Sequence, residues 1–194
     1  DDFTGEAFVN AGVELQRLID LEPFQDGFLA APWPGPDGES GTMGNGLAAM
    51  DLMGQWAPSA FATDSASGEG IGDDLGWFPF PAVEGGTGEA TVGLGGGDGF
   101  AVGRDAEPEA VEFLEYITNV DNASRFGETG QGLPVTAGAE GSVADPSQKL
   151  VLAGMGETTE IQLYLDQFFT PELGGVINDE VQALFAGSST PEEV

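Results

Sequence analysis

Apolar residues three and four positions apart predict helices at both ends and in the middle of the chain. Residues 6–21 gather their apolar and small side chains on one face, which is typical of an amphipathic helix. A clearer helix is expected over 108–118, because Pro108 lies in its first turn and acidic residues flank its N-terminal end. Further helices are expected at 121–127 with Asp121 as cap, at 146–154 after Asp145, at 161–169, and over 173–185 before Gly187.

The segments predicted to form strands are shorter than the predicted helices. Alternating apolar positions predict a strand at 51–56, and apolar runs predict strands at 90–94 and 100–102 on either side of a glycine-rich turn. Residues 77–81 are strand-like but contain two prolines, which favours the edge of a sheet or the end of a strand. The intervening segments are predicted to be loops at 22–44 and 59–74, and a short helix or turn at 45–50.

The two ends of the sequence lead us to expect part of a longer protein. The chain begins abruptly at Asp1-Asp2-Phe3. Near the other end, Thr190-Pro191-Glu192-Glu193 is typical of a capping box, which marks the start of a helix. The sequence ends at Val194, before that helix has a body.

The chain is strongly acidic. Among 194 residues, 34 are Asp or Glu and 4 are Lys or Arg, so the formal net charge is −30. Such a surface repels phosphate backbones and anionic lipids, which argues against nucleic-acid and membrane-surface partners. It suits a salt-rich medium, where counter-ions screen the self-repulsion. The hydrophobic fraction of 40% still allows a core.

The sequence contains no Cys and no His. It therefore cannot form disulfides, thiolate or imidazole zinc sites, cysteine nucleophiles or a Ser-His-Asp triad. No loop has calcium-binding spacing, and no glycine-rich loop ends in Gly-Lys-Ser/Thr. We expect no metal, no cofactor and no catalytic residue, and we interpret the many acids as a solvated surface.

A glutamine and a tryptophan end the segment 46–56. The apolar face of a sugar stacks on an indole while an amide reaches its hydroxyl groups, so Gln55 and Trp56 are candidate ligand contacts. Gly97 and Asp98 are further candidates, because glycines let the backbone approach a ligand while the carboxylate accepts from sugar hydroxyls. The alternatives are that Trp56 is a core residue and that Asp98 is a turn residue tolerating unusual backbone angles.

The order of these features resembles that of a known family. It comprises a helix with Ala11-Gly12, the segment 46–56, Trp77-Phe78-Pro79-Phe80-Pro81, a glycine-rich turn into Phe100-Ala101-Val102, the helix after Pro108, Gly130-Gln131-Gly132-Leu133-Pro134-Val135, and Ser189-Thr190-Pro191-Glu192-Glu193. This order is similar to that in the C-terminal half of extracellular solute-binding proteins of sugar ABC importers, the maltose-binding-protein class. The resemblance covers nearly the whole chain.

The resemblance implies an α/β fold, a periplasmic-binding-protein-like type II lobe with a mixed sheet flanked by helices, incomplete here. Residues 1–194 would form mostly the second lobe, with segments that pack on a first lobe that is missing or supplied by a partner chain. The resemblance also implies an extracellular, cell-surface location with a lipid anchor on the missing N-terminal part. The implied partners are an oligosaccharide, such as a xylo- or cello-oligosaccharide, and the membrane subunits of an ABC permease.

Further site residues follow from the same resemblance. The matching family segment presents an aromatic side chain to the ligand, which makes Tyr164 a stacking candidate, with Gln162 and Asp166 as polar neighbours; the alternative is a solvated helix face. Two function classes remain: a non-enzymatic sugar-binding protein that closes two lobes around its ligand, or a secreted glycoside hydrolase or carbohydrate-binding module using paired carboxylates. The sequence singles out no acid pair, and the resemblance favours binding.

Overall fold

The computed structural model describes residue 3 and residues 5–194, which divide into two compact units. Unit 1 combines the segment that ends at Ala31 with Leu163–Val194, and unit 2 comprises Pro32–Gln162. The described residues contain eight α-helices and one two-stranded sheet. No helix in this part of the chain is long and apolar enough to cross a lipid bilayer.

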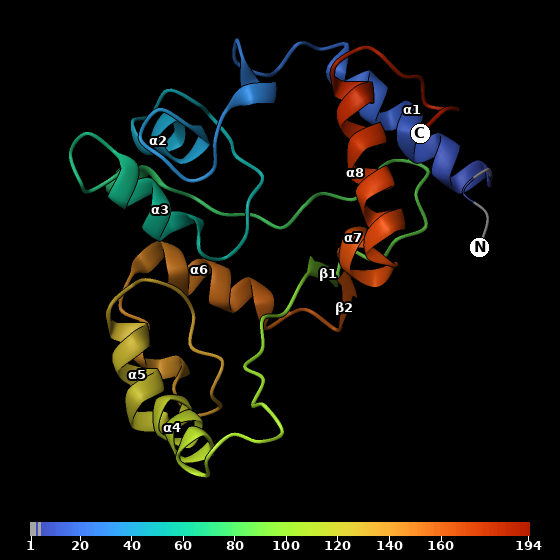
Figure 1. The fold of residues 1–194 in the computed structure, drawn as a ribbon. Helices are drawn as coiled ribbons and strands as arrows, with labels where there is room; N and C mark the ends of the chain where they lie inside the picture. Colours follow the sequence, from blue (N-terminus) through green and yellow to red (C-terminus); the bar gives the residue numbers. More distant parts are fainter. Residues whose placement is uncertain (1–2, 4) are drawn as a thin grey trace. The chain divides into compact units, whose positions relative to one another are not determined.

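Unit 1 is built on two long helices from opposite ends of the sequence. Helix α1 (Glu6–Ile19) packs against α8 (Pro171–Phe185), and the short α7 (Leu165–Phe168) also packs on α8 (Figure 1). Helix α8 begins with the Thr170 hydroxyl accepting from the Leu173 N–H at 3.4 Å. It ends before Gly187, whose φ of +70° lies in the left-handed region that glycine adopts without strain.

Small residues allow close packing in unit 1. A Cβ on Gly12 of α1 would lie 3.1 Å from Pro191, so a larger residue there would push the two segments apart. A Cβ on Gly174 of α8 would lie 2.7 Å from the Cα of Asp166 in α7. Leu184 is fully buried near the end of α8. A short 3₁₀ helix, η1 (Phe28–Ala30), completes the unit.

The first half of unit 2 forms around helices α2 (Glu39–Gly44) and α3 (Ala57–Asp64), which lie side by side (Figure 1). Its core contains Met43, Ala57 and Phe61, with partly buried residues packed around them: Trp33, Ala48, Met53, Ile71 and Leu75. The 3₁₀ helix η2 (Gly72–Asp74) follows. This core fixes both ends of the segment 45–56, which carries the predicted Gln55–Trp56 pair.

The second half of unit 2 contains α4 (Glu109–Thr118), α5 (Val120–Glu128), η3 (Glu140–Ser142) and α6 (Pro146–Met155). Helix α5 contacts both α4 and η3. A separate small core forms from Leu133, Val143 and Val151, with Leu152 packed against it.

The sheet consists of β1 (Val92–Gly95) and β2 (Glu160–Leu163), which run parallel. The Thr159 N–H donates to the Thr91 carbonyl at 2.9 Å, just before both strands. Further along the sheet, a Cβ on Gly95 would lie 3.6 Å from Cγ2 of Ile161. Because parallel strands end at the same edge of a sheet, the residues that follow Gly95 and Ile161 emerge at one edge.

Several predicted elements are confirmed. The helices expected at 6–21, 108–118, 146–154 and 173–185 correspond to α1, α4, α6 and α8. Asp145 caps α6, because its Oδ1 accepts from the Gln148 N–H at 2.8 Å. Half of the predicted capping box also forms, since the Glu193 carboxylate accepts from the Thr190 N–H at 3.1 Å.

Other predictions are wrong, and packing explains most of the differences. No strand forms at 51–56, 77–81 or 100–102. The sheet of the described residues has two parallel strands, whereas a mixed sheet was expected. The predicted loop 59–74 contains most of α3, where alanines favour a helix and Phe61 enters the core. The loop 22–44 contains α2, and the expected helix 161–169 divides into β2 and α7. Asn119 rather than Asp121 caps α5, accepting from the Asn122 N–H at 2.9 Å.

Candidate ligand-binding site

Trp56 is the N-cap residue of α3 in unit 2. Its indole ring lies against Gly54, where any Cβ would clash with the ring atoms. The Gly54 carbonyl accepts from the Ala57 N–H at 3.0 Å, so a tight turn leads into α3. The side chain remains 40% exposed. One part of the ring therefore packs on the protein, and the rest is available to a ligand.

Gln55 is fixed by a contact far away in the sequence. Its Oε1 accepts from the Leu133 N–H at 3.1 Å, which joins the two halves of unit 2. The turn that carries Leu133 is itself anchored, because the buried Gln148 side chain donates from Nε2 to the Gly130 carbonyl at 2.8 Å. An amide has both an acceptor and two donor hydrogens. With its oxygen directed to Leu133, Gln55 can donate from its nitrogen to a ligand next to Trp56.

Two carboxyl groups, one of them in the segment 45–56, interact with one another. Glu39 is the first residue of α2, and Asp51 lies four positions before Gln55 in the sequence. Partial burial of Glu39, its hydrogen bond with Asp51 and the repulsion between the two groups raise the pKa of Glu39 to about 7. Oδ2 of Asp51 is buried, and no protein N–H or hydroxyl group donates to it. This pair cannot be recognised from the sequence, because the two residues are twelve positions apart in a chain rich in acids.

A second acidic contact ties α2 to the end of α3. The buried Ser40 hydroxyl donates to Oδ2 of Asp64 at 2.6 Å, and the Gly35 N–H donates to the same oxygen at 3.0 Å. Asp64 therefore has two donors, unlike Asp51. This network orients the N-terminal end of α2, where Glu39 begins the helix.

The sheet brings other predicted residues toward one edge. Gly97 and Asp98 follow the end of β1 in an exposed loop, and Gln162 lies exposed near the end of parallel β2. Since both strands end at the same edge, the loop with Gly97 and Asp98 begins at the edge near which Gln162 lies in β2. This arrangement follows from the pairing of β1 with β2, which sequence reasoning missed.

Tyr164 and Asp166 belong to unit 1. The Tyr164 carbonyl accepts from the N–H groups of Gln167 and Phe168, which places Tyr164 at the cap of α7 with its side chain half-buried. The Asp166 carboxylate accepts from the Asn178 side chain at 3.3 Å, so α8 orients it. Unit 2 therefore contains Gln55, Trp56, Asp98 and Gln162, and unit 1 contains Tyr164 and Asp166.

Comparison with known proteins supplies the family. The family model of the bacterial extracellular solute-binding proteins matches residues 3–124. The chain belongs to this family. The matched residues include Gln55, Trp56 and Asp98, and therefore most of the candidate site in unit 2. No curated protein matches the chain.

Membership gives this solute-binding protein an extracellular location, a ligand and transporter partners in general terms. The family is in general non-enzymatic. Among the described residues of this solute-binding protein, no group of three or more Asp or Glu side chains could hold a metal ion.

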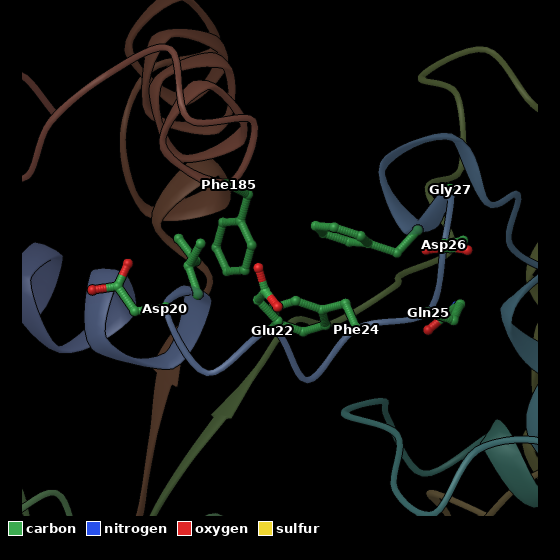
Figure 2. A pocket seen from close by; sticks show the side chains of 9 residues that line it. Asp20, Glu22, Phe24, Gln25, Asp26, Gly27 and Phe185 are labelled. Carbon is green, nitrogen blue, oxygen red and sulfur yellow. The ribbon is translucent and has the colours of Figure 1, made fainter.

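The solute-binding protein also has a pocket that the sequence did not predict. It lies in unit 1, has a volume of about 590 Å³, and contains Phe24, Phe28 and Phe185 (Figure 2). Phe24 stacks on Phe28 with 4.6 Å between ring centroids, and Phe185 at the end of α8 lies 5.6 Å from Phe24. The rings thus pack mainly on one another, and none of the predicted site residues lines this pocket.

Proposed function

We propose that the chain binds a neutral oligosaccharide for import by an ABC transporter. The observation that carries this proposal is the Gln55–Trp56 pair, in which a partly exposed indole lies beside an amide whose oxygen is already fixed by Leu133. A sugar ring could stack on the open part of the indole while the amide nitrogen donates to a hydroxyl group. The family match supplies the general context of an extracellular receptor.

The remaining candidates are further residues of unit 2 and two residues of unit 1. Asp98 and Gln162, at one edge of the sheet, would accept from and donate to further hydroxyl groups, with Gly97 allowing close backbone approach. In unit 1, Tyr164 is a separate stacking candidate and Asp166 a separate hydrogen-bonding candidate. Asp166 is already oriented by Asn178, so its placement would cost little additional side-chain entropy.

We propose further that the residues form mostly the second lobe of a two-lobed receptor that encloses its ligand by hinge closure. The first lobe would come from sequence outside these 194 residues or from a partner chain. A lipid anchor on that missing part would keep the receptor at the cell surface, where it delivers the sugar to the permease subunits.

The hydrolase alternative receives less support from the structure. A retaining glycosidase separates its two carboxyl groups by about 5 Å, and an inverting one by about 6.5–9.5 Å, which leaves room for the sugar or a water molecule. Glu39 is the carboxyl group whose pKa is raised, and one cause of this shift is a hydrogen bond with a neighbouring carboxyl group, that of Asp51.

A binding and turnover experiment tests the proposal. Isothermal titration calorimetry with xylo-, cello- and malto-oligosaccharides should give saturable binding of at least one neutral series, and the same sugars should remain intact after prolonged incubation. Aryl-glycosides provide a sensitive control for hydrolysis. Failure to bind any neutral oligosaccharide would contradict the proposal, and hydrolysis lost in the Glu39→Gln variant would establish the hydrolase alternative.

A further inference from the structure

We propose that Gln148 is a positioning residue, which sets the orientation of the Gln55 amide through the turn at 130–133. The inference rests on the proposed function, because it assigns Gln148 a role at the same sugar site. Gln148 is fully buried, so it would not touch the sugar. It would act through two hydrogen bonds, its own to Gly130 and the one between Leu133 and Gln55.

Helix α6 holds Gln148 in place. The Asp145 carboxylate accepts from the Gln148 N–H at 2.8 Å and thereby caps the helix. One turn further along α6, Val151 packs in the core that also contains Leu133. Residues three positions apart lie on the same side of a helix. Gln148 and Val151 therefore contact the turn at 130–133 from one face of α6.

The turn itself has little to restrict its backbone. Gly130 has a φ of +69°, and Gly132 is a second glycine two positions later. Glycine has wide conformational freedom, so this turn needs contacts from outside to keep one shape. Only two residues separate the Gly130 carbonyl, which is bonded to Gln148, from the Leu133 N–H, which is bonded to Gln55. Fixing the carbonyl therefore restricts the directions in which the N–H can point.

The direction of the Leu133 N–H decides which way the Gln55 amide faces. An amide can rotate to exchange its oxygen and its nitrogen, and only the oxygen can accept from an N–H group. Because Oε1 of Gln55 accepts from Leu133 at 3.1 Å, the amide nitrogen is directed elsewhere and can donate to a ligand. If Leu133 moved away, the amide could present either atom. The sugar would then have to select one orientation when it binds, which would cost affinity.

Packing alone does not account for a glutamine at this position. Oε1 of Gln148 is buried, and no described residue donates to it. A buried amide oxygen without a protein donor opposes folding, because its hydration is lost. A methionine has a similar length and carries no such oxygen, so it could fill the same space. The feature that a methionine lacks is the N–H group that donates to Gly130.

The first arm of the test needs no ligand. Amide hydrogen exchange of Leu133 is measured by NMR in the wild type and in Gln148→Met, with the amides of Phe61 and Val151 as references. General destabilisation would speed exchange at all three amides alike. We expect the increase at Leu133 to exceed that at either reference by at least about threefold, because one local hydrogen bond is lost.

Two results of this arm would overturn the inference. One is unchanged exchange at Leu133, and the other is an equal change at all three amides, which would show that Gln148 stabilises the fold without positioning Leu133. Gln148→Leu also lacks the donor, and it provides the same comparison if Gln148→Met does not fold.

The second arm is a double-mutant cycle on sugar affinity, measured by calorimetry with the tightest-binding oligosaccharide from the panel. Gln148→Met should weaken binding by about twofold to tenfold, the range that corresponds to one hydrogen bond. In Gln55→Leu no amide remains to be oriented. Adding Gln148→Met to this variant should therefore change the affinity by less than about 1.5-fold.

Thr136→Val is the matched control for the second arm. The Thr136 hydroxyl donates to the Thr118 carbonyl at 2.9 Å, so this variant removes one hydrogen bond near the turn and leaves Gly130 and Gln55 unchanged. It should bind sugar as the wild type does.

The two proposals fail in different ways. Equal losses of affinity from Gln148→Met in the wild type and in Gln55→Leu would overturn the inference even if sugar binding is confirmed. Faster exchange at Leu133 alone, in a chain that binds no neutral oligosaccharide, would support the link from Gln148 to Gln55 and contradict the proposed function.

Discussion

Replacing Trp56 by alanine tests whether the indole contributes to binding or only to packing. A whole tryptophan presents up to about 250 Å², and 40% exposure leaves about 100 Å² of Trp56 for a ligand to cover. At about 25 cal/mol per Å², complete coverage would contribute about 2.5 kcal/mol. A sugar ring that covers about half of this area would contribute about 1.2 kcal/mol by the same coefficient. Trp56→Ala should therefore weaken binding by about eightfold to seventyfold.

The chain offers a matched control for this experiment. Trp77 is 38% exposed, similar to Trp56, and its ring also lies against a glycine, Gly154. Trp77→Ala removes a comparable area from a position outside the candidate site. Affinity is measured by isothermal titration calorimetry on both variants, and circular dichroism melting shows whether each remains folded.

Two outcomes would contradict a stacking role for Trp56. If Trp56→Ala binds sugar as tightly as the wild type while remaining folded, Trp56 is a packing residue and the site lies elsewhere. Equal losses in Trp56→Ala and Trp77→Ala would show that general destabilisation, rather than stacking, reduces affinity. Trp56→Phe keeps an aromatic ring of smaller area, so it should retain part of the affinity lost in Trp56→Ala.

Three further predictions concern single side chains. Gln55→Leu leaves the buried Leu133 N–H without its acceptor, so urea denaturation should show a loss of about 1–3 kcal/mol; an unchanged midpoint would mean that the hydrogen bond contributes nothing. Asp98→Asn preserves shape but loses charge assistance, so calorimetry should show a smaller loss of sugar affinity than for Asp98→Ala, and the reverse order would contradict a hydrogen-bonding role. Asp145→Ala removes the cap of α6, so it should lower the free energy of unfolding by about 1 kcal/mol, whereas Asp145→Asn should retain most of that stability.

The helices illustrate what the sequence could predict. In α4 and α6, Pro108 and Asp145 mark the N-terminal ends, and these local signals correctly predict where the helices begin. Gly187 likewise marks the end of α8. Such signals depend on the conformations of a few neighbouring residues and on hydrogen bonds within one turn. They are therefore visible without knowledge of the tertiary contacts.

The strands illustrate what the sequence could not predict. Alternation at 51–56 indicated a strand, yet no partner strand pairs with this segment in the part of the chain that the structure describes. The segment 90–94 does contribute a strand, because β2 supplies the hydrogen-bonding partner from almost seventy residues away. A strand requires a neighbour that local pattern cannot identify.

The candidate site likewise has features that follow from residue identity and features that depend on tertiary contacts. Residue identities alone establish that Gln55 and Trp56 are neighbours of a kind that can bind a sugar, that no Cys or His chemistry is available, and that the chain is highly acidic. The bond from the Leu133 N–H to the Gln55 oxygen and the interaction of Glu39 with Asp51 are visible only in the folded chain. Side-chain chemistry is fixed by residue identity, whereas these contacts depend on how helices and loops pack. Packing brings together residues whose sequence separation gives no sign of their proximity.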